Sequence, residues 1–143
     1  MPLTVACEPA VICLSGRDPM HPRRARQQAR TVLAAWGLGE HADVCELIVD
    51  ELVVNAVCHG EGPVEVRLSF TAGDLRIEVH DEGAGRPVRR HAGSDDECGR
   101  GLEVLDGLIE EYGGERGVAD DQAGPGKTVY VRLSLATSTA GAR

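Results

Sequence analysis

ELVVNAVCHG, residues 51–60, has two polar side chains, Glu51 and Asn55, in the otherwise apolar run that extends to Cys58. With the residues before it, this run predicts a helix from about Ala42 to Cys58, because apolar residues recur at helical spacing and no glycine or proline interrupts them. Glu51 and Asn55 are four residues apart and therefore lie on one face of that helix. They mark its solvent side or enter a polar pocket, because unpaired burial would cost several kcal/mol.

The segments around this helix predict one sheet with helices on one face. In chain order they are a strand at 10–14, a helix at 22–36, the helix just described, a hairpin of strands at 64–70 and 75–80, a helix at 102–111, and a final strand pair near Val118 and at 127–135. A chain of 143 residues holds one domain with a core and no second one. We therefore expect an α+β two-layer sandwich with a mixed, mostly antiparallel sheet and three helices, as a single domain over residues 1–143.

The overall charge narrows the classes of partner. A formal net charge of −8 and a sequence pI of about 5.1 disfavour direct binding to nucleic acid and to an anionic membrane surface. The N-terminal residues lack a basic leader, and no run approaches the roughly 18 apolar residues of a membrane span. We expect a cytoplasmic protein.

The cysteines favour the same compartment. Their number is odd, their spacing is wide, and no CxxC pair is present, which argues against a zinc site and a disulfide scaffold. The five residues, expected to be reduced thiols, are Cys7, Cys13, Cys45, Cys58 and Cys98.

A glycine-rich turn follows the second strand of the hairpin, in the sequence DEGAGRP at 81–87. Glycines there remove Cβ atoms that would keep a ligand from the main chain. The Asp81 carboxylate, at the strand end, could accept a hydrogen bond from an exocyclic amine such as that of adenine. An ordinary turn is the alternative.

Two further turns carry weaker signals. GRGL at 99–102 opens a helix, and the backbone N–H groups of a helix start can bind phosphate. GPGKT at 124–128 leads into the last strand, where the Thr128 hydroxyl could lie beside Asp81. Each is also compatible with a plain turn.

Together, ELVVNAVCHG, DEGAGRP, GRGL and GKT resemble, in order, the N, G1, G2 and G3 boxes of the Bergerat-type ATPases, which include histidine kinases and gyrase. The resemblance covers roughly residues 10–135. The short chain and the AWGL sequence at 35–38 resemble the actinobacterial relatives of the anti-sigma-factor serine/threonine kinases. The resemblance implies the Bergerat ATP-binding fold with ATP and Mg²⁺ as cofactors.

The resemblance also implies roles for individual residues. Asn55 would ligate Mg²⁺, and Glu51 would be the general base or polarising group. Asp81 would bind the adenine amine. Gly83 and Gly85 would shape the adenine pocket.

The remaining motif residues would surround the rest of the nucleotide. Thr128 would close the adenine network, and Gly99 and Gly101 would lie along the phosphates. Arg100, or one of Arg89 and Arg90, would neutralise phosphate charge. Residues 86–98 would form the ATP lid, and residues 136–143 a flexible tail.

The implied function is an ATP-dependent serine/threonine kinase of an anti-anti-sigma (STAS-type) protein that also binds a sigma factor, in a partner-switching system. Two alternatives stay open: a nucleotide-gated module that binds its partner without phosphorylating it, and a slow stand-alone ATPase. Homodimer formation through the apolar edge strand at 10–14 is also left open.

Overall fold

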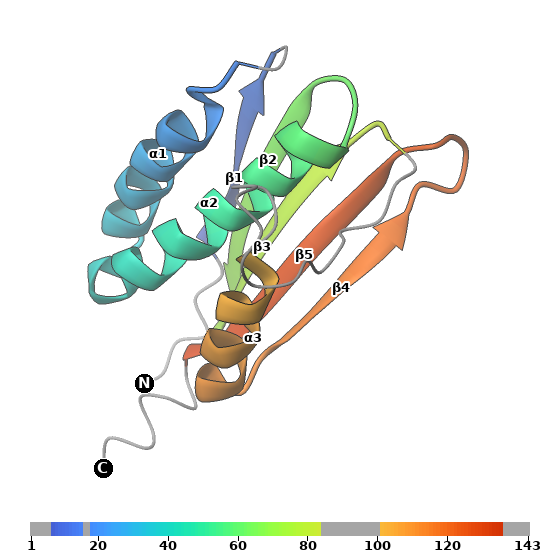
Figure 1. The fold of residues 1–143 in the computed structure, drawn as a ribbon. Helices are drawn as coiled ribbons and strands as arrows, with labels where there is room; N and C mark the ends of the chain where they lie inside the picture. The colour runs from blue at the N-terminus through green and yellow to red at the C-terminus, as the bar shows by residue number, and fades with distance from the viewer. Residues whose placement is uncertain (1–6, 16–17, 84–100, 136–143) are drawn as a thin grey trace.

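Five strands form one sheet, and three α-helices lie on one face of it (Figure 1). The computed structural model describes residues 7–15, 18–83 and 101–135. In chain order the elements are β1 (Cys7–Leu14), α1 (His21–Ala35), the short 3-10 helix η1 (Gly39–His41), α2 (Ala42–His59), β2 (Val64–Thr71), β3 (Asp74–Asp81), α3 (Gly101–Tyr112), β4 (Glu115–Asp120) and β5 (Lys127–Ser134). The α+β two-layer sandwich expected from the sequence is confirmed.

The spatial order of the strands is β1-β2-β3-β5-β4. Each pairing among these described strands is antiparallel. The sequence analysis expected a mixed, mostly antiparallel sheet, so the antiparallel part of that prediction is confirmed and the parallel part is not observed. The expected hairpin is present as β2 and β3, which are joined by a tight turn at Ala72 and Gly73, both with positive φ. The final strand pair is β4 and β5.

The register of β3 against β5 decides which side chains can meet. Asp81 is opposite Lys127, and His80 is opposite Thr128. Successive side chains of a strand point to opposite faces of the sheet. Burial alternates accordingly, so that Asp81 and Lys127 face the helices together with the apolar residues of both strands.

The core lies between the sheet and the helices, and it is aliphatic. Helix α1 contributes Ala29 and Leu33, α2 contributes Leu52, and α3 contributes Leu105, each with no more than 1% of its surface exposed. Within a helix the buried apolar residues recur at helical spacing, as Ala25, Ala29 and Leu33 do in α1, and this is why the apolar pattern predicted the helices. Helix α2 has apolar contacts with the sheet over most of its length and is thereby fixed above β3.

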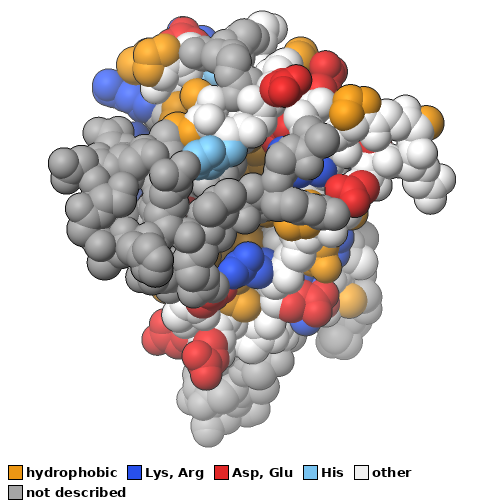
Figure 2. All heavy atoms as spheres, turned by 45° about the vertical axis from the view of Figure 1, so that its right-hand side comes forward, with side chains coloured by type: hydrophobic (Ala, Val, Ile, Leu, Met, Phe, Trp, Pro, Cys, Tyr) orange, Lys and Arg blue, Asp and Glu red, His pale blue; other side chains and the backbone are white. Residues whose placement is uncertain are grey.

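Ion pairs connect α1 to α2 along their exposed sides. Arg26 donates a hydrogen bond to Asp50 at 2.9 Å, and Arg30 pairs with both Asp43 and Glu46. Acidic and basic side chains are interspersed with apolar ones over the described part of the face in Figure 2.

The thiols differ from expectation at one position. Cys58, in the last turn of α2, is disulfide-bonded, so the prediction that every cysteine is reduced is wrong there. Cys13 and Cys45 are free. The side chain of Cys7 and all of Cys98 lie outside the described residues.

Two expected segments, the ATP lid at 86–98 and the tail at 136–143, also lie outside the described residues. Among the helices that are described, none combines the length and the apolarity needed to cross a bilayer.

Candidate functional site

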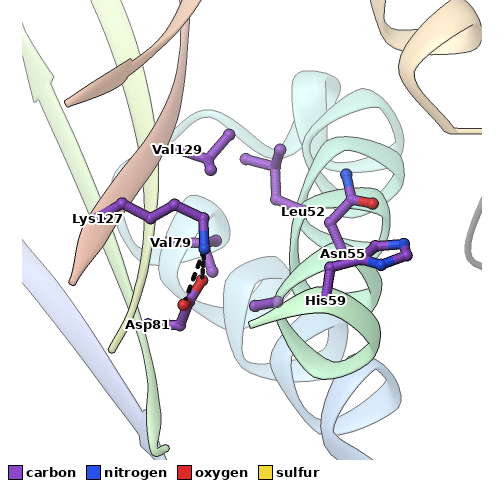
Figure 3. Close-up of a pocket in the computed structure, with 8 residues that line it drawn as sticks. Leu52, Asn55, His59, Val79, Asp81, Lys127 and Val129 are labelled. Atoms are coloured by element: carbon purple, nitrogen blue, oxygen red, sulfur yellow. Dashed lines mark hydrogen bonds and ion pairs between the residues drawn. The ribbon is translucent and has the colours of Figure 1, made fainter. Parts of the chain in front are cut away.

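A small pocket lies between the C-terminal half of α2 and the adjacent ends of β3 and β5 (Figure 3). Its cavity measures about 10 Å³, which is the room needed for about one water molecule. The lining residues are Leu52, Asn55, Ala56 and His59 of α2, Val79 and Asp81 of β3, and Lys127 and Val129 of β5. Four of these residues are apolar and four are polar or charged, so the pocket combines both kinds of surface.

Helix α2 brings the motif amide into this pocket. Asn55 is buried with 8% of its surface exposed, and it is one of the residues that line the pocket. Glu51, one turn earlier, is half-buried and does not line the pocket. His59, the last residue of α2, also lines the pocket.

Asp81 is the most buried polar residue of the site, with 1% of its surface exposed. Its Oδ1 accepts hydrogen bonds from the Gly83 N–H at 2.7 Å and from the Glu61 N–H at 3.4 Å. The strand end and the segment after α2 thus hold the carboxylate in a fixed orientation. A buried carboxylate requires such partners, because burying an unpaired charge is very unfavourable.

The remaining partner of Asp81 is Lys127, which the sequence analysis did not single out. Its Nζ lies 3.0 Å from Oδ1 and 3.0 Å from Oδ2, and it also donates to the Gly83 carbonyl at 3.3 Å. Figure 3 shows the ammonium group meeting the carboxylate inside the pocket. Lys127 is itself buried, with 4% of its surface exposed, so this is a buried ion pair.

The backbone around Asp81 is packed too closely for side chains. A Cβ on Gly60 would lie 2.4 Å from the Asp81 carboxyl carbon, and one on Gly83 would lie 3.0 Å from the Glu61 nitrogen. The Glu82 N–H donates to the Glu61 carbonyl at 2.8 Å and joins the two segments. A side chain at position 83 would therefore be crowded against the backbone of Glu61.

Thr128 does not lie beside Asp81. It is opposite His80 on the other face of the sheet, where it lines an open groove with Glu65, Arg67 and Glu78. The expectation of a Thr128 hydroxyl next to Asp81 is therefore wrong by one position in the strand, because a step of one residue reverses the face. The residue at that place is Lys127.

The other motif residues are described only in part. Gly101 is the first residue of α3. Gly85, Gly99 and Arg100 lie outside the described residues. The structure therefore brings together Asn55, Asp81 and Gly83 of the predicted set.

Sequence reasoning missed Lys127 and the packing role of Gly60. The alternation along residues 127–135 offered a signal for the first, because it groups Lys127 with the buried Val129. The close approach of Gly60 to Asp81 depends on the tertiary fold and leaves no local signal in the sequence.

The polar residues of the pocket are of the types that can bind a nucleotide together with Mg²⁺. Within the described ranges, no group of three or more His, Cys, Asp and Glu side chains could hold a metal ion by itself. Mg²⁺ commonly binds through few protein ligands together with water and phosphate oxygens, and the buried Asn55 amide suits that role. The cavity beside Asp81, in contrast, is too small for a purine base while Lys127 occupies it.

Comparison with known proteins gives matches of family and of fold. The histidine kinase-like ATPase domain family matches residues 17–133. No curated protein matches the chain. A histidine kinase domain from a blue-light-activated histidine kinase of Erythrobacter litoralis is 26% identical with a TM-score of 0.52, over 71% of this chain and 48% of that one.

A second solved structure contains the RsbU and RsbW domains of a Mycobacterium tuberculosis protein. It is 24% identical with a TM-score of 0.61, over 90% of this chain and 33% of that one. The chain thus spans half or less of the solved chains it resembles. The match of the family over residues 17–133, with the antiparallel sheet and its three helices, shows that this chain belongs to the histidine kinase-like ATPase domain family.

Proposed function

We propose that this chain binds Mg-ATP in the pocket between α2, β3 and β5, and that it acts as a regulatory protein in partner switching. The observation that carries the proposal is the buried Asp81 carboxylate, oriented by backbone N–H groups in a pocket that the buried Asn55 also lines. Membership of the ATPase domain family supports the nucleotide, and the likeness to a chain with an RsbW domain suggests the regulatory context.

The proposed roles follow from the chemistry of each side chain. Asp81 accepts a hydrogen bond from the exocyclic amine of adenine, and Gly83 keeps that approach open. The Asn55 amide oxygen binds Mg²⁺, which neutralises phosphate charge when it is bound. Gly99, Gly101 and Arg100 contact the phosphates.

The proposed reaction is phosphorylation of a serine on an anti-anti-sigma (STAS-type) protein. Glu51, one helical turn from Asn55, accepts the proton of the serine hydroxyl as general base. When this anti-anti-sigma protein is phosphorylated, the chain binds a sigma factor in its place. Pairing of two copies through the edge strand β1 is part of this proposal.

A second function is favoured by the Lys127–Asp81 ion pair. Because the pair fills the base pocket, nucleotide binding would be weak, and the chain could act as a nucleotide-gated binding module without phosphoryl transfer. The two functions differ in their dependence on Glu51. Only the kinase requires that carboxylate.

The test is phosphate transfer from labelled ATP to candidate STAS-type proteins. Wild type should label the antagonist, and Glu51→Gln should lower the rate by about 100-fold or more, as expected for loss of a general base. Glu46→Gln is the matched control, because Glu46 lies on the same helix but pairs with Arg30 outside the pocket. Equal transfer by wild type and Glu51→Gln would contradict the role of Glu51. ATP-sensitive partner binding without transfer would favour the binding module.

A further inference from the structure

Lys127 is the only lysine in a chain that has 15 Lys and Arg residues in total. Arginine supplies the positive charge at each of the other 14 positions, whereas the single lysine is buried inside the candidate base pocket. The two residue types are not interchangeable, because an ammonium is a compact point charge and a guanidinium is a wide planar fork. A cavity of about 10 Å³ leaves no room for the larger group.

The ammonium group has its full set of partners. An ammonium donates three hydrogen bonds, and Nζ of Lys127 has three acceptors, namely Oδ1 and Oδ2 of Asp81 and the carbonyl of Gly83. Such complete pairing offsets much of the cost of removing both charges from water. With Lys127 inside the pocket, every N–H donor of its ammonium group therefore has an acceptor.

The two carboxylate oxygens of Asp81 differ in how many donors they already have. Oδ1 of Asp81 accepts from two backbone N–H groups in addition to Lys127. Within residues 7–15, 18–83 and 101–135, Oδ2 accepts from Lys127 alone. A base amine that binds Asp81 would approach Oδ2, and the ammonium group occupies that space, because the cavity left beside it measures only about 10 Å³.

We propose that Lys127 is an internal competitor for the base of the nucleotide, and that it sets the affinity of this pocket. The inference rests on the proposed ATP site. When the pocket is empty, the side chain fills it and pairs with Asp81. When a nucleotide binds, the ammonium group leaves the carboxylate and the base takes its place.

The direction of the effect follows from the strengths of the two contacts. A charged donor forms a stronger hydrogen bond to a carboxylate than a neutral amine does, so the exchange is unfavourable at Asp81. The apparent affinity of a ligand falls with the fraction of molecules in the competent state. Lys127 therefore lowers nucleotide affinity, and its removal raises it.

Calorimetry with Mg-ATP tests this on wild type and Lys127→Thr. The variant should bind at least about tenfold more tightly, which corresponds to about 1.4 kcal/mol. Adding Asp81→Asn to Lys127→Thr should remove that gain, because the gain depends on the freed carboxylate. Equal or weaker binding by Lys127→Thr, with a wild type that binds ATP, overturns the inference and leaves the ATP site standing.

A measurement on the wild type keeps the test independent of how the variant folds. An amine-acylating reagent can modify only Lys127 and the α-amino group, and mass spectrometry of peptides separates the two. Lys127 should be protected in the free protein and should react at least about tenfold faster with saturating Mg-ATP. Unchanged protection while ATP is bound overturns the inference. No ATP binding by wild type or Lys127→Thr, with both folded by circular dichroism, overturns the proposed ATP site itself.

Discussion

Asp81 shows how a single residue can be predicted while its principal partner is not. A carboxylate at a strand end before a glycine-rich turn is visible in the sequence, and the structure buries it in the pocket. Its partner depends on strand register, which differs between Lys127 and Thr128 by one position. The alternation along residues 127–135 groups Lys127 with the buried Val129, but the pairing of β3 with β5 decides which of the two residues meets Asp81.

Gly60 offers a direct test of the packing around Asp81. Gly60→Ala would place a Cβ 2.4 Å from the Asp81 carboxyl carbon, so we expect a loss of about 1–3 kcal/mol in the free energy of unfolding. The measurement is urea denaturation. Gly107→Ala in α3 is the matched control, because no atom lies within 4 Å of its Cβ and alanine should stabilise that helix by about 0.5–1 kcal/mol. Equal effects at both positions would refute the close approach.

Cys45 is buried on α2, and burial raises the pKa of its thiol from 9.0 to about 12. The folded protein therefore holds this proton more tightly than the unfolded chain does. Its contribution to stability is complete below pH 9 and is lost as the pH rises from about 9 to 12. The difference in unfolding free energy between wild type and Cys45→Ala should shrink across that range. A constant difference would contradict the raised pKa.

At the scale of elements, the helices were predictable because their apolar periodicity is long and uninterrupted. The expected helix at 42–58 is observed as Ala42–His59, and the hairpin strands match within one residue at each end. For strand β4, the sequence predicted only a position near Val118 and not its bounds. The reason is that this six-residue strand has mostly exposed or half-buried side chains and therefore little alternation. That all the described strands pair antiparallel could be learned only from the strand pairings in the structure.

The ion pairs between α1 and α2 make a prediction about how these helices associate. The Arg26–Asp50 pair has a contact of 2.9 Å, and both side chains are partly exposed. A double-mutant cycle of Arg26→Ala and Asp50→Ala should give a coupling energy of about 0.2–1 kcal/mol that decreases in high salt. Thermal or urea unfolding of the four proteins provides the values. A coupling that is independent of salt would show that the contact is not electrostatic.

At the scale of the whole molecule, one sheet face serves two purposes. The core that fixes α2 on the sheet also fixes the pocket that Asn55 and Asp81 both line, so the candidate site lies at the end of the hydrophobic core. The fold class could be predicted because four motifs occur in order over nearly the whole chain. The state of the pocket could not, since it depends on a lysine that fills the space where the base would bind.

The most direct test of the ATP site is calorimetric titration of Mg-ATP into wild type, Asn55→Ala and Thr128→Ala. Binding should require magnesium and should be lost in Asn55→Ala, whose side chain lies in the pocket. Thr128→Ala should bind as wild type does, because Thr128 lies on the opposite face of the sheet. Binding that is independent of magnesium and equal in all three proteins would contradict the nucleotide site between α2, β3 and β5.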